Sequence, residues 1–249
     1  MKNLFSMPGF LWLLLTLIVI VVIGRGLILV LRKSDPAMQR RILVRTSVVT
    51  VFWVIVISFL SIIGFFSQFN SLPPRLPLVI ILPLPVVFMF AFSKSGTMLL
   101  RTIPQHWLVF MQSFRIFVEL LLWLGFLRNM LPVQMTFEGG NLDIMTGILS
   151  VPVGFAILRQ KNYSTKLTVL FNIIGLVLLL NILVIAMLSM PTPLRHFMNE
   201  PANTLVTIFP FILLPGVLVP VAYSLHILSL RKLFIERKEK EISLIPSHR

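Results

Sequence analysis

Three polar side chains in the middle of a strongly apolar stretch, residues 104–130, have the types and spacing to do chemistry. Gln112, Arg115 and Glu119 fall on one face of a helix that turns about 100° per residue. Charged side chains are costly at membrane depth, so this stripe indicates either a functional site or a buried structural pair. The arginine could bind an anionic group and the glutamate could exchange protons, while the glutamine offers both donors and acceptors.

The same residues allow a structural interpretation. Arg115 and Glu119 are separated by four positions, so their side chains can meet along the helix. A paired arginine and glutamate cost much less inside a membrane than either charge alone. The sequence leaves two alternatives open, a polar stripe that faces a cavity and a salt bridge that holds the bundle together.

Further oxygen-bearing side chains follow in the next connector. Glu138, Asn141 and Asp143 are expected on the same side of the membrane as Glu119. Oxygen ligands suit calcium or magnesium, but this spacing matches no recognised metal loop, so we expect no metal site. The simpler interpretation makes Glu138 an exposed loop charge and places Asn141 and Asp143 at the start of the next helix as capping groups.

The last apolar stretch contains Pro210, Pro215 and Pro220 at intervals of five residues. Prolines interrupt the hydrogen-bond ladder of a helix, and the freed carbonyls then need other partners. Broken helices of this kind form ion and substrate sites in transporters, and they also serve as packing kinks. His226 follows in the same stretch, and we include it with the polar residues above in a predicted ligand or ion pathway.

Cofactor chemistry finds little support. The chain has no cysteine, which excludes disulfides, thiolate zinc sites and iron–sulfur clusters. Axial haem ligation by His106 and His226 is conceivable because their depths are similar. The spans carry no periodic histidine pairs, so we expect no cofactor.

Composition identifies the class of protein that must position these residues. Of the 249 residues, 57% are hydrophobic and 12% charged, and the mean hydropathy is +0.97. These values predict an all-α, polytopic membrane helix bundle with a single transmembrane domain, residues 1–233, and a charged tail, residues 234–249. The seven predicted spans are residues 8–31, 42–66, 76–92, 104–130, 142–158, 167–190 and 204–230.

The basic residues predict how the bundle is oriented. They are concentrated in alternate connectors and in the tail, and the opposite connectors hold few. The basic residues of these connectors and of the tail are Arg32, Lys33, Arg40, Arg41, Lys94, Arg101, Arg159, Lys161, Lys166, Arg231, Lys232, Arg237, Lys238, Lys240 and Arg249. The positive-inside rule therefore places the N-terminus outside and the C-terminus in the cytoplasm of a bacterial inner membrane. Anionic lipid headgroups account for the net charge of +14, so we expect no nucleic-acid partner, and protein partners stay unspecified.

Two segments carry a resemblance to other proteins. PQHWLVFMQSFRIFVELLLW, residues 104–123, and MTFEGGNLDIMTG, residues 135–147, resemble segments of uncharacterised bacterial seven-span integral membrane proteins. The resemblance implies a seven-span architecture and no particular activity.

Three classes of function remain. The first is small-solute or proton-coupled transport through a polar intramembrane cavity, with Arg115 as the anion anchor and Glu119 as the proton carrier. The second is a membrane enzyme that uses Glu119, Glu138 or Asp143 at an outward-facing site, although no nucleophile accompanies these carboxylates. The third is a structural or sensory subunit of a membrane complex.

Overall fold

The computed structural model describes residues 7–32, 35–71, 73–159 and 165–243. Helices recur through these ranges and no strand occurs in them, which confirms the all-α class. Five of the helices in this part of the chain are long and apolar enough to cross a membrane, and counting one bent pair as a span gives six. The chain is therefore a helical membrane protein.

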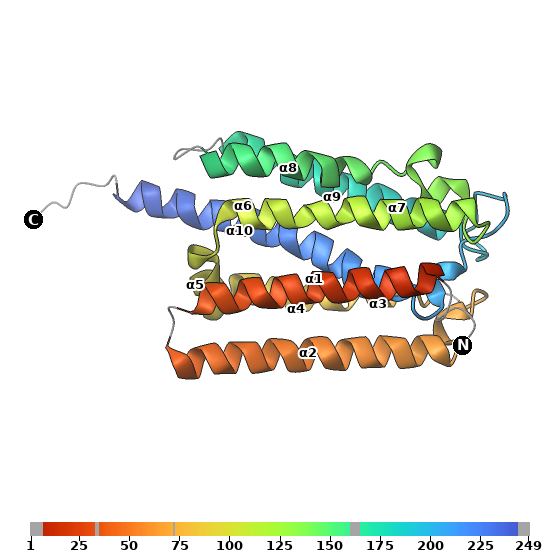
Figure 1. Cartoon of the computed structure of the whole chain (residues 1–249), viewed down its shortest axis with the longest axis horizontal. Helices are drawn as coiled ribbons and strands as arrows, with labels where there is room; N and C mark the ends of the chain where they lie inside the picture. Colours follow the sequence, from red (N-terminus) through yellow and green to blue (C-terminus); the bar gives the residue numbers. More distant parts are fainter. Residues whose placement is uncertain (1–6, 33–34, 72, 160–164, 244–249) are drawn as a thin grey trace, which may run out of the picture.

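Three long helices match predicted spans closely. They are α1 (Met7–Leu31), α2 (Pro36–Ile62) and α9 (Thr165–Leu188). The Asp35 side chain accepts a hydrogen bond from the Met38 amide at 3.0 Å and caps the start of α2, where Pro36 takes the first helical position. Figure 1 shows α2 at the edge of the bundle, and only Ile57 and Ser61 are buried in it.

The third predicted span, residues 76–92, forms two helices in succession. These are α3 (Pro77–Ile81) and α4 (Pro83–Phe92), and α5 (Lys94–Thr102) follows after a bend of 75°. The bend falls at Ser93, whose hydroxyl oxygen accepts from the Gly96 amide at 2.9 Å and caps α5. The prolines of the span divide α3 from α4, whereas the sharp bend lies beyond them.

The fourth predicted span, residues 104–130, is α6 (Gln105–Phe110), the 3-10 segment η2 (Met111–Ser113) and α7 (Phe114–Leu127). The fifth, residues 142–158, is α8 (Ile144–Arg159), whose 16 residues give a length of about 24 Å. The two spans approach very closely at Gly147, where an added Cβ would lie 2.8 Å from the Ile116 side chain and 2.9 Å from its backbone nitrogen. This approach places the start of α8 beside α7.

The seventh predicted span, residues 204–230, differs most from its prediction. It opens with the 3-10 turn η5 (Leu205–Thr207), and the helix begins only with the π-helical segment η6 (Leu214–Leu218), which continues into α10 (Val219–Ser243). Pro210 precedes the helix, Pro215 lies in its first turn and Pro220 is the second residue of α10. The prolines therefore shape the start of a helix that continues well into the predicted tail, of which residues 244–249 lie outside the described ranges.

The π-helical segment has a chemical cause. Pro220 has no N–H to donate to the Gly216 carbonyl, and the neighbouring bond runs five residues back, from the Val219 amide to the Leu214 carbonyl. The Gly216 carbonyl accepts instead from the indole Nε1 of Trp53 at 2.7 Å. A side chain on α2 thus satisfies a carbonyl that the proline leaves free, as membrane burial requires.

The helices lie along the long axis of the molecule, with α10 passing through the middle (Figure 1). It packs on α9, α6, α4 and α5. We call the end with α5 and the C-terminus of α10 the basic end, and the opposite end, where α1 begins, the loop end. At the loop end, Gln134 and Asn199 exchange amide hydrogen bonds. A hydrogen bond from Arg195 holds the pKa of the exposed Glu200 carboxyl below its usual value.

Replacing Trp53 with phenylalanine tests the role of the indole. We expect Trp53→Phe to lower the free energy of unfolding by about 1 kcal/mol, because a buried carbonyl loses its interhelical donor. Thermal unfolding in detergent, followed by circular dichroism, measures the change. The control Phe52→Leu alters a neighbouring ring that is 66% exposed and should change stability less. Equal effects of the two substitutions would contradict this role.

Candidate functional site

The central interaction of the site joins Arg115 at the start of α7 to Asp143 just before α8. The Arg115 side chain is 1% exposed. Its Nε donates to Asp143 Oδ2 at 2.6 Å, and its Nη2 donates to Asp143 Oδ1. The two parallel bonds make a bidentate ion pair, the geometry in which a guanidinium and a carboxylate match best. The ion pair of Arg115 thus connects two helices, whereas the sequence had offered Glu119 on the same helix as its partner.

His226 on α10 extends this cluster. Arg115 Nη1 lies 3.1 Å from His226 Nε2. A guanidinium has only donors, so Nε2 must accept and the ring hydrogen of the neutral imidazole resides on Nδ1. Nδ1 lies 2.9 Å from Asn172 Oδ1, which accepts that hydrogen. The ring fits because α9 has Gly175 here; an added Cβ would lie 2.3 Å from His226 Cε1.

The polar chain continues toward the basic end through buried amides. Asn172 Nδ2 donates to the Thr168 carbonyl and to Ser229 Oγ, both at 2.7 Å. Gln105 Nε2 on α6 also donates to Ser229 Oγ, at 2.6 Å. The orientation of the Asn172 amide follows from the tautomer of His226, because Oδ1 accepts from the ring and Nδ2 is left to donate to Ser229.

Glu119 lies one turn beyond Arg115 on α7 and is also 1% exposed. Its Oε2 accepts from Asn141 Nδ2 at 2.6 Å. The other end of the same amide, Asn141 Oδ1, accepts from the Asp143 backbone nitrogen at 3.1 Å. Asn141 therefore bridges Glu119 and the ion pair, and within the described residues no cationic side chain hydrogen-bonds to Glu119.

The connector before α8 holds Asn141 in place. It contains the 3-10 turns η3 (Val133–Met135) and η4 (Phe137–Gly139). The backbone N–H of Asn141 donates to the Thr136 carbonyl at 3.1 Å. Gly140 adopts a φ of 106°, which favours glycine. Its carbonyl accepts from Asn181 Nδ2 on α9 at 3.0 Å. The connector is thus a folded loop that is hydrogen-bonded to α9 and holds Asn141 beside Glu119.

The remaining predicted residues lie apart from this cluster. Gln112 Nε2 donates to the Ala222 carbonyl at 3.1 Å and links η2 to α10. Glu138 is exposed and accepts from Trp123 Nε1 at 2.9 Å. The structure brings Asn141 and Asp143 together without Glu138, and no group of three potential metal-binding side chains occurs among the residues it describes.

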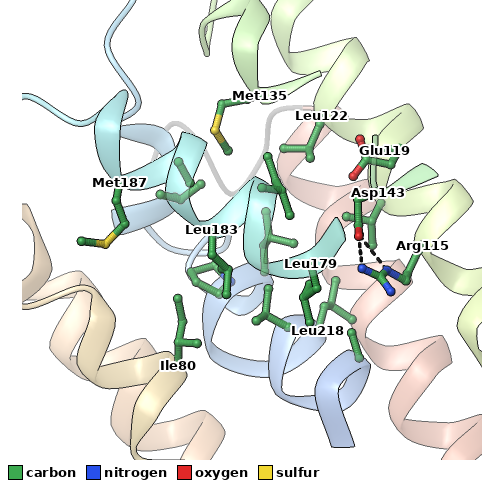
Figure 2. Close-up of a pocket in the computed structure, with 18 of the residues that line it drawn as sticks. Ile80, Arg115, Glu119, Leu122, Met135, Asp143, Leu179, Leu183, Met187 and Leu218 are labelled. Carbon is green, nitrogen blue, oxygen red and sulfur yellow. Dashed lines mark hydrogen bonds and ion pairs between the residues drawn. The ribbon is translucent and has the colours of Figure 1, made fainter. Parts of the chain in front are cut away.

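A small cavity of about 60 Å³ adjoins the cluster. Most of its lining is apolar and comes from α3, α7, α9, η6 and the start of α10, with Pro215 contributing and Pro210 and Pro220 absent. Its charged lining residues are Arg115, Glu119 and Asp143. Figure 2 shows these three on one side, while Ile80 and Met187 lie on the other.

Several members of the polar chain were accessible from the sequence and one was not. Gln105 lies seven residues before Gln112 and so on the same helix face, and the amide of Asn172 stands out in an apolar run. Ser229 gives no such signal, because serines in membrane helices commonly bond to their own backbone. Asp143 was visible, but only the tertiary structure identifies it as the partner of Arg115.

Substitutions at Arg115 and Asp143 test whether the two side chains stabilise the protein through their contact with each other. Arg115→Ala or Asp143→Ala should each destabilise the protein by about 3–5 kcal/mol, because each leaves a buried charge without its partner. The double variant Arg115→Met with Asp143→Leu should have a free energy of unfolding much closer to that of the parent, because it leaves no buried charge unpaired. Unfolding midpoints in detergent measure all three, and additive losses would show that the two side chains act independently.

The comparisons with known proteins give a family and no activity. Residues 73–234 match the family described as Domain of unknown function (DUF8737). No curated protein and no solved structure matches the chain. The matched range begins just before α3 and includes each residue of the polar chain from Gln105 to Ser229, while α1 and α2 lie outside it. Because the match covers more than half of the sequence, the chain belongs to the DUF8737 family.

Proposed function

We propose that this chain is a proton-coupled transport protein of the bacterial cytoplasmic membrane, in which Glu119 exchanges a proton against a small solute in the cavity. One observation carries the proposal. Glu119 is a buried carboxyl at the edge of a cavity, and the nearby ion pair leaves it without a cation to balance its charge.

The charge count of the cluster gives the reason. Arg115 and Asp143 carry opposite charges and neutralise each other, and His226 is neutral when it accepts from Arg115. An ionised Glu119 would add one uncompensated negative charge, which costs several kcal/mol at membrane depth. Either a proton on the carboxyl or a cation in the cavity removes this cost. Glu119 is therefore suited to alternate between a protonated state and an ionised state that is paired with a cation.

The polar chain connects the proposed exchange site to the rest of the bundle. Side chains from Glu119 to Gln105 are linked by hydrogen bonds through Asn141, the ion pair, His226, Asn172 and Ser229. The links run from the cavity toward the basic end. In this proposal the proton is exchanged at Glu119 itself, while His226 stays neutral and, by accepting from Arg115, helps to hold the guanidinium on Asp143.

A seven-span topology belongs to the proposal. The long segments alternate in direction along the molecule (Figure 1): α1, α3 with α4, α8 and α10 run toward the basic end, and α2, α6 with α7, and α9 run toward the loop end. The two segments shorter than a full span are α3 with α4, Pro77–Phe92, and α8, Ile144–Arg159. We propose that both cross, with the basic end in the cytoplasm as the positive-inside rule predicts, and with anionic headgroups as the lipid partners of that end.

The absence of cysteine allows a direct test of this orientation. We expect Met198→Cys, at the loop end, to react with a membrane-impermeant maleimide in intact spheroplasts. Lys238→Cys, at the basic end, should react only after the membrane is permeabilised. The cysteine-free parent is the background control. Labelling of Lys238→Cys in intact spheroplasts would contradict the proposed orientation.

Proton flux tests the proposed function. We expect Glu119→Gln to reduce by at least tenfold the proton flux that a pH gradient drives in exchange for a panel of small inorganic and organic cations, in proteoliposomes that contain a pH-sensitive dye, because glutamine keeps the shape but cannot carry the proton. Glu138→Gln, at an exposed carboxyl, is the matched control and should leave flux unchanged. Equal flux in the parent, Glu119→Gln and protein-free vesicles would overturn the proposal, provided that both variants unfold at the parent temperature.

A structural role is the second candidate, and the bidentate pair between α7 and α8 favours it. In that case the cluster only joins helices. A folded double variant Arg115→Met with Asp143→Leu would then keep the full biological activity, and Glu119→Gln would have no effect on proton movement.

A further inference from the structure

We infer that the cavity binds the ammonium end of a linear amphiphile that enters from the lipid between α3 and α9. This inference rests on the proposed function for the exchange role of Glu119, and it names the class of substrate. Four features carry it: the size of the cavity, the side on which it opens, the free acceptor at its inner end and the charge of the cluster.

The size of the cavity limits what it can hold. About 60 Å³ is enough for a small head group and the first few methylene groups, and too little for a whole amphiphile. The lining near the cluster includes Val118, Leu122 and Leu218, which suit an alkyl segment. The remainder of a longer chain must lie outside the bundle.

The apolar side of the cavity faces the membrane. Ile80, Leu183 and Met187 line it and are only half-buried, whereas Arg115 and Glu119 at the other side are 1% exposed. Beyond them, large apolar side chains are exposed on both flanking helices: Ile81 on α3, and Leu180 and Val184 on α9. In the inferred mode of binding this surface meets lipid, so the outer part of an alkyl chain can stay among lipid tails while its head reaches the cluster.

The inner end of the cavity offers an acceptor. Both oxygens of Asp143 accept from Arg115, and Arg115 also bonds to His226. On Glu119, Oε2 accepts from Asn141, while no hydrogen bond from the described residues reaches Oε1. The side chain is nine-tenths buried and lines the cavity. A ligand that completes this site must donate a hydrogen bond.

The charge of the cluster selects a cationic donor. With Glu119 ionised, Arg115, Glu119 and Asp143 sum to one negative charge, which an ammonium group cancels. A carboxylate or sulfonate head would add a second uncompensated negative charge. An alcohol would satisfy Oε1 but would leave the charge in place. A proton and an alkylammonium therefore compete for the same carboxyl.

Binding of three matched amphiphiles tests this assignment. Octylammonium, octanol and octanoate share a chain and differ in head group. With the full-length protein in nanodiscs of phosphatidylcholine, and after subtraction of protein-free nanodiscs, we expect octylammonium to bind at least tenfold more tightly than the other two. Glu119→Gln should reduce octylammonium affinity by at least tenfold.

A pair of tryptophan substitutions on α9 tests the route. Leu183→Trp fills the apolar side of the cavity and should abolish octylammonium binding. Leu180→Trp adds the same ring one turn away on the lipid-facing surface, where Leu180 is 61% exposed, and should leave binding unchanged. Equal binding by the two variants would overturn the lateral route, provided that both unfold at the parent temperature.

The outcomes separate this inference from the proposed function. Equal affinity for all three amphiphiles, or octylammonium binding that does not depend on Glu119, would overturn the assignment of an ammonium ligand. If proton flux nevertheless depended on Glu119, the proposed transport function would stand without this substrate. Octylammonium binding that depends on Glu119, with no proton flux, would support the site and contradict transport.

Discussion

The ion pair between Arg115 and Asp143 is the interaction on which the rest of the structure depends. A guanidinium that is 1% exposed inside a membrane helix must be neutralised within contact distance. The only way to bring Asp143 there is to hold the start of α8 against α7, and the missing side chain at Gly147 permits that approach. The connector before α8 is folded into two 3-10 turns for the same reason, since it must deliver a carboxylate at a defined depth.

Once this pair is formed, the other polar groups have little freedom. Arg115 can only donate to His226, which fixes the imidazole hydrogen on the side of Asn172. Asn141 uses its oxygen on the Asp143 backbone, so only its NH₂ group is left for Glu119. Each step follows from the donors and acceptors of the preceding side chain. The result is a chain in which Glu119 alone retains an unbalanced charge, and that charge lies on the cavity.

The sequence predicted the parts of this arrangement that depend on periodicity and composition. Apolar runs located the long helices within a few residues, and the stripe on residues 104–130 located Arg115 and Glu119. It could not predict that Arg115 pairs with Asp143, because contacts between helices leave no spacing rule comparable to the four-residue rule within one helix. The start of the last helix was misplaced for a related reason. Residues 204–213 are as apolar as a span, but they fold as a turn and irregular segment, and only proline chemistry distinguishes them.

The irregular start of the last helix lies beside the cavity. Because Pro220 cannot donate, the ladder at the start of the last helix runs through the π-helical turn η6, which packs on α1, α2 and α3. Leu214, Pro215 and Leu218 from that turn line the cavity. The start of the last helix thus contributes apolar lining beside a carboxyl that lies on another helix. Glu119, which carries the uncompensated charge of the cluster, and the irregular start of the last helix therefore line the same cavity.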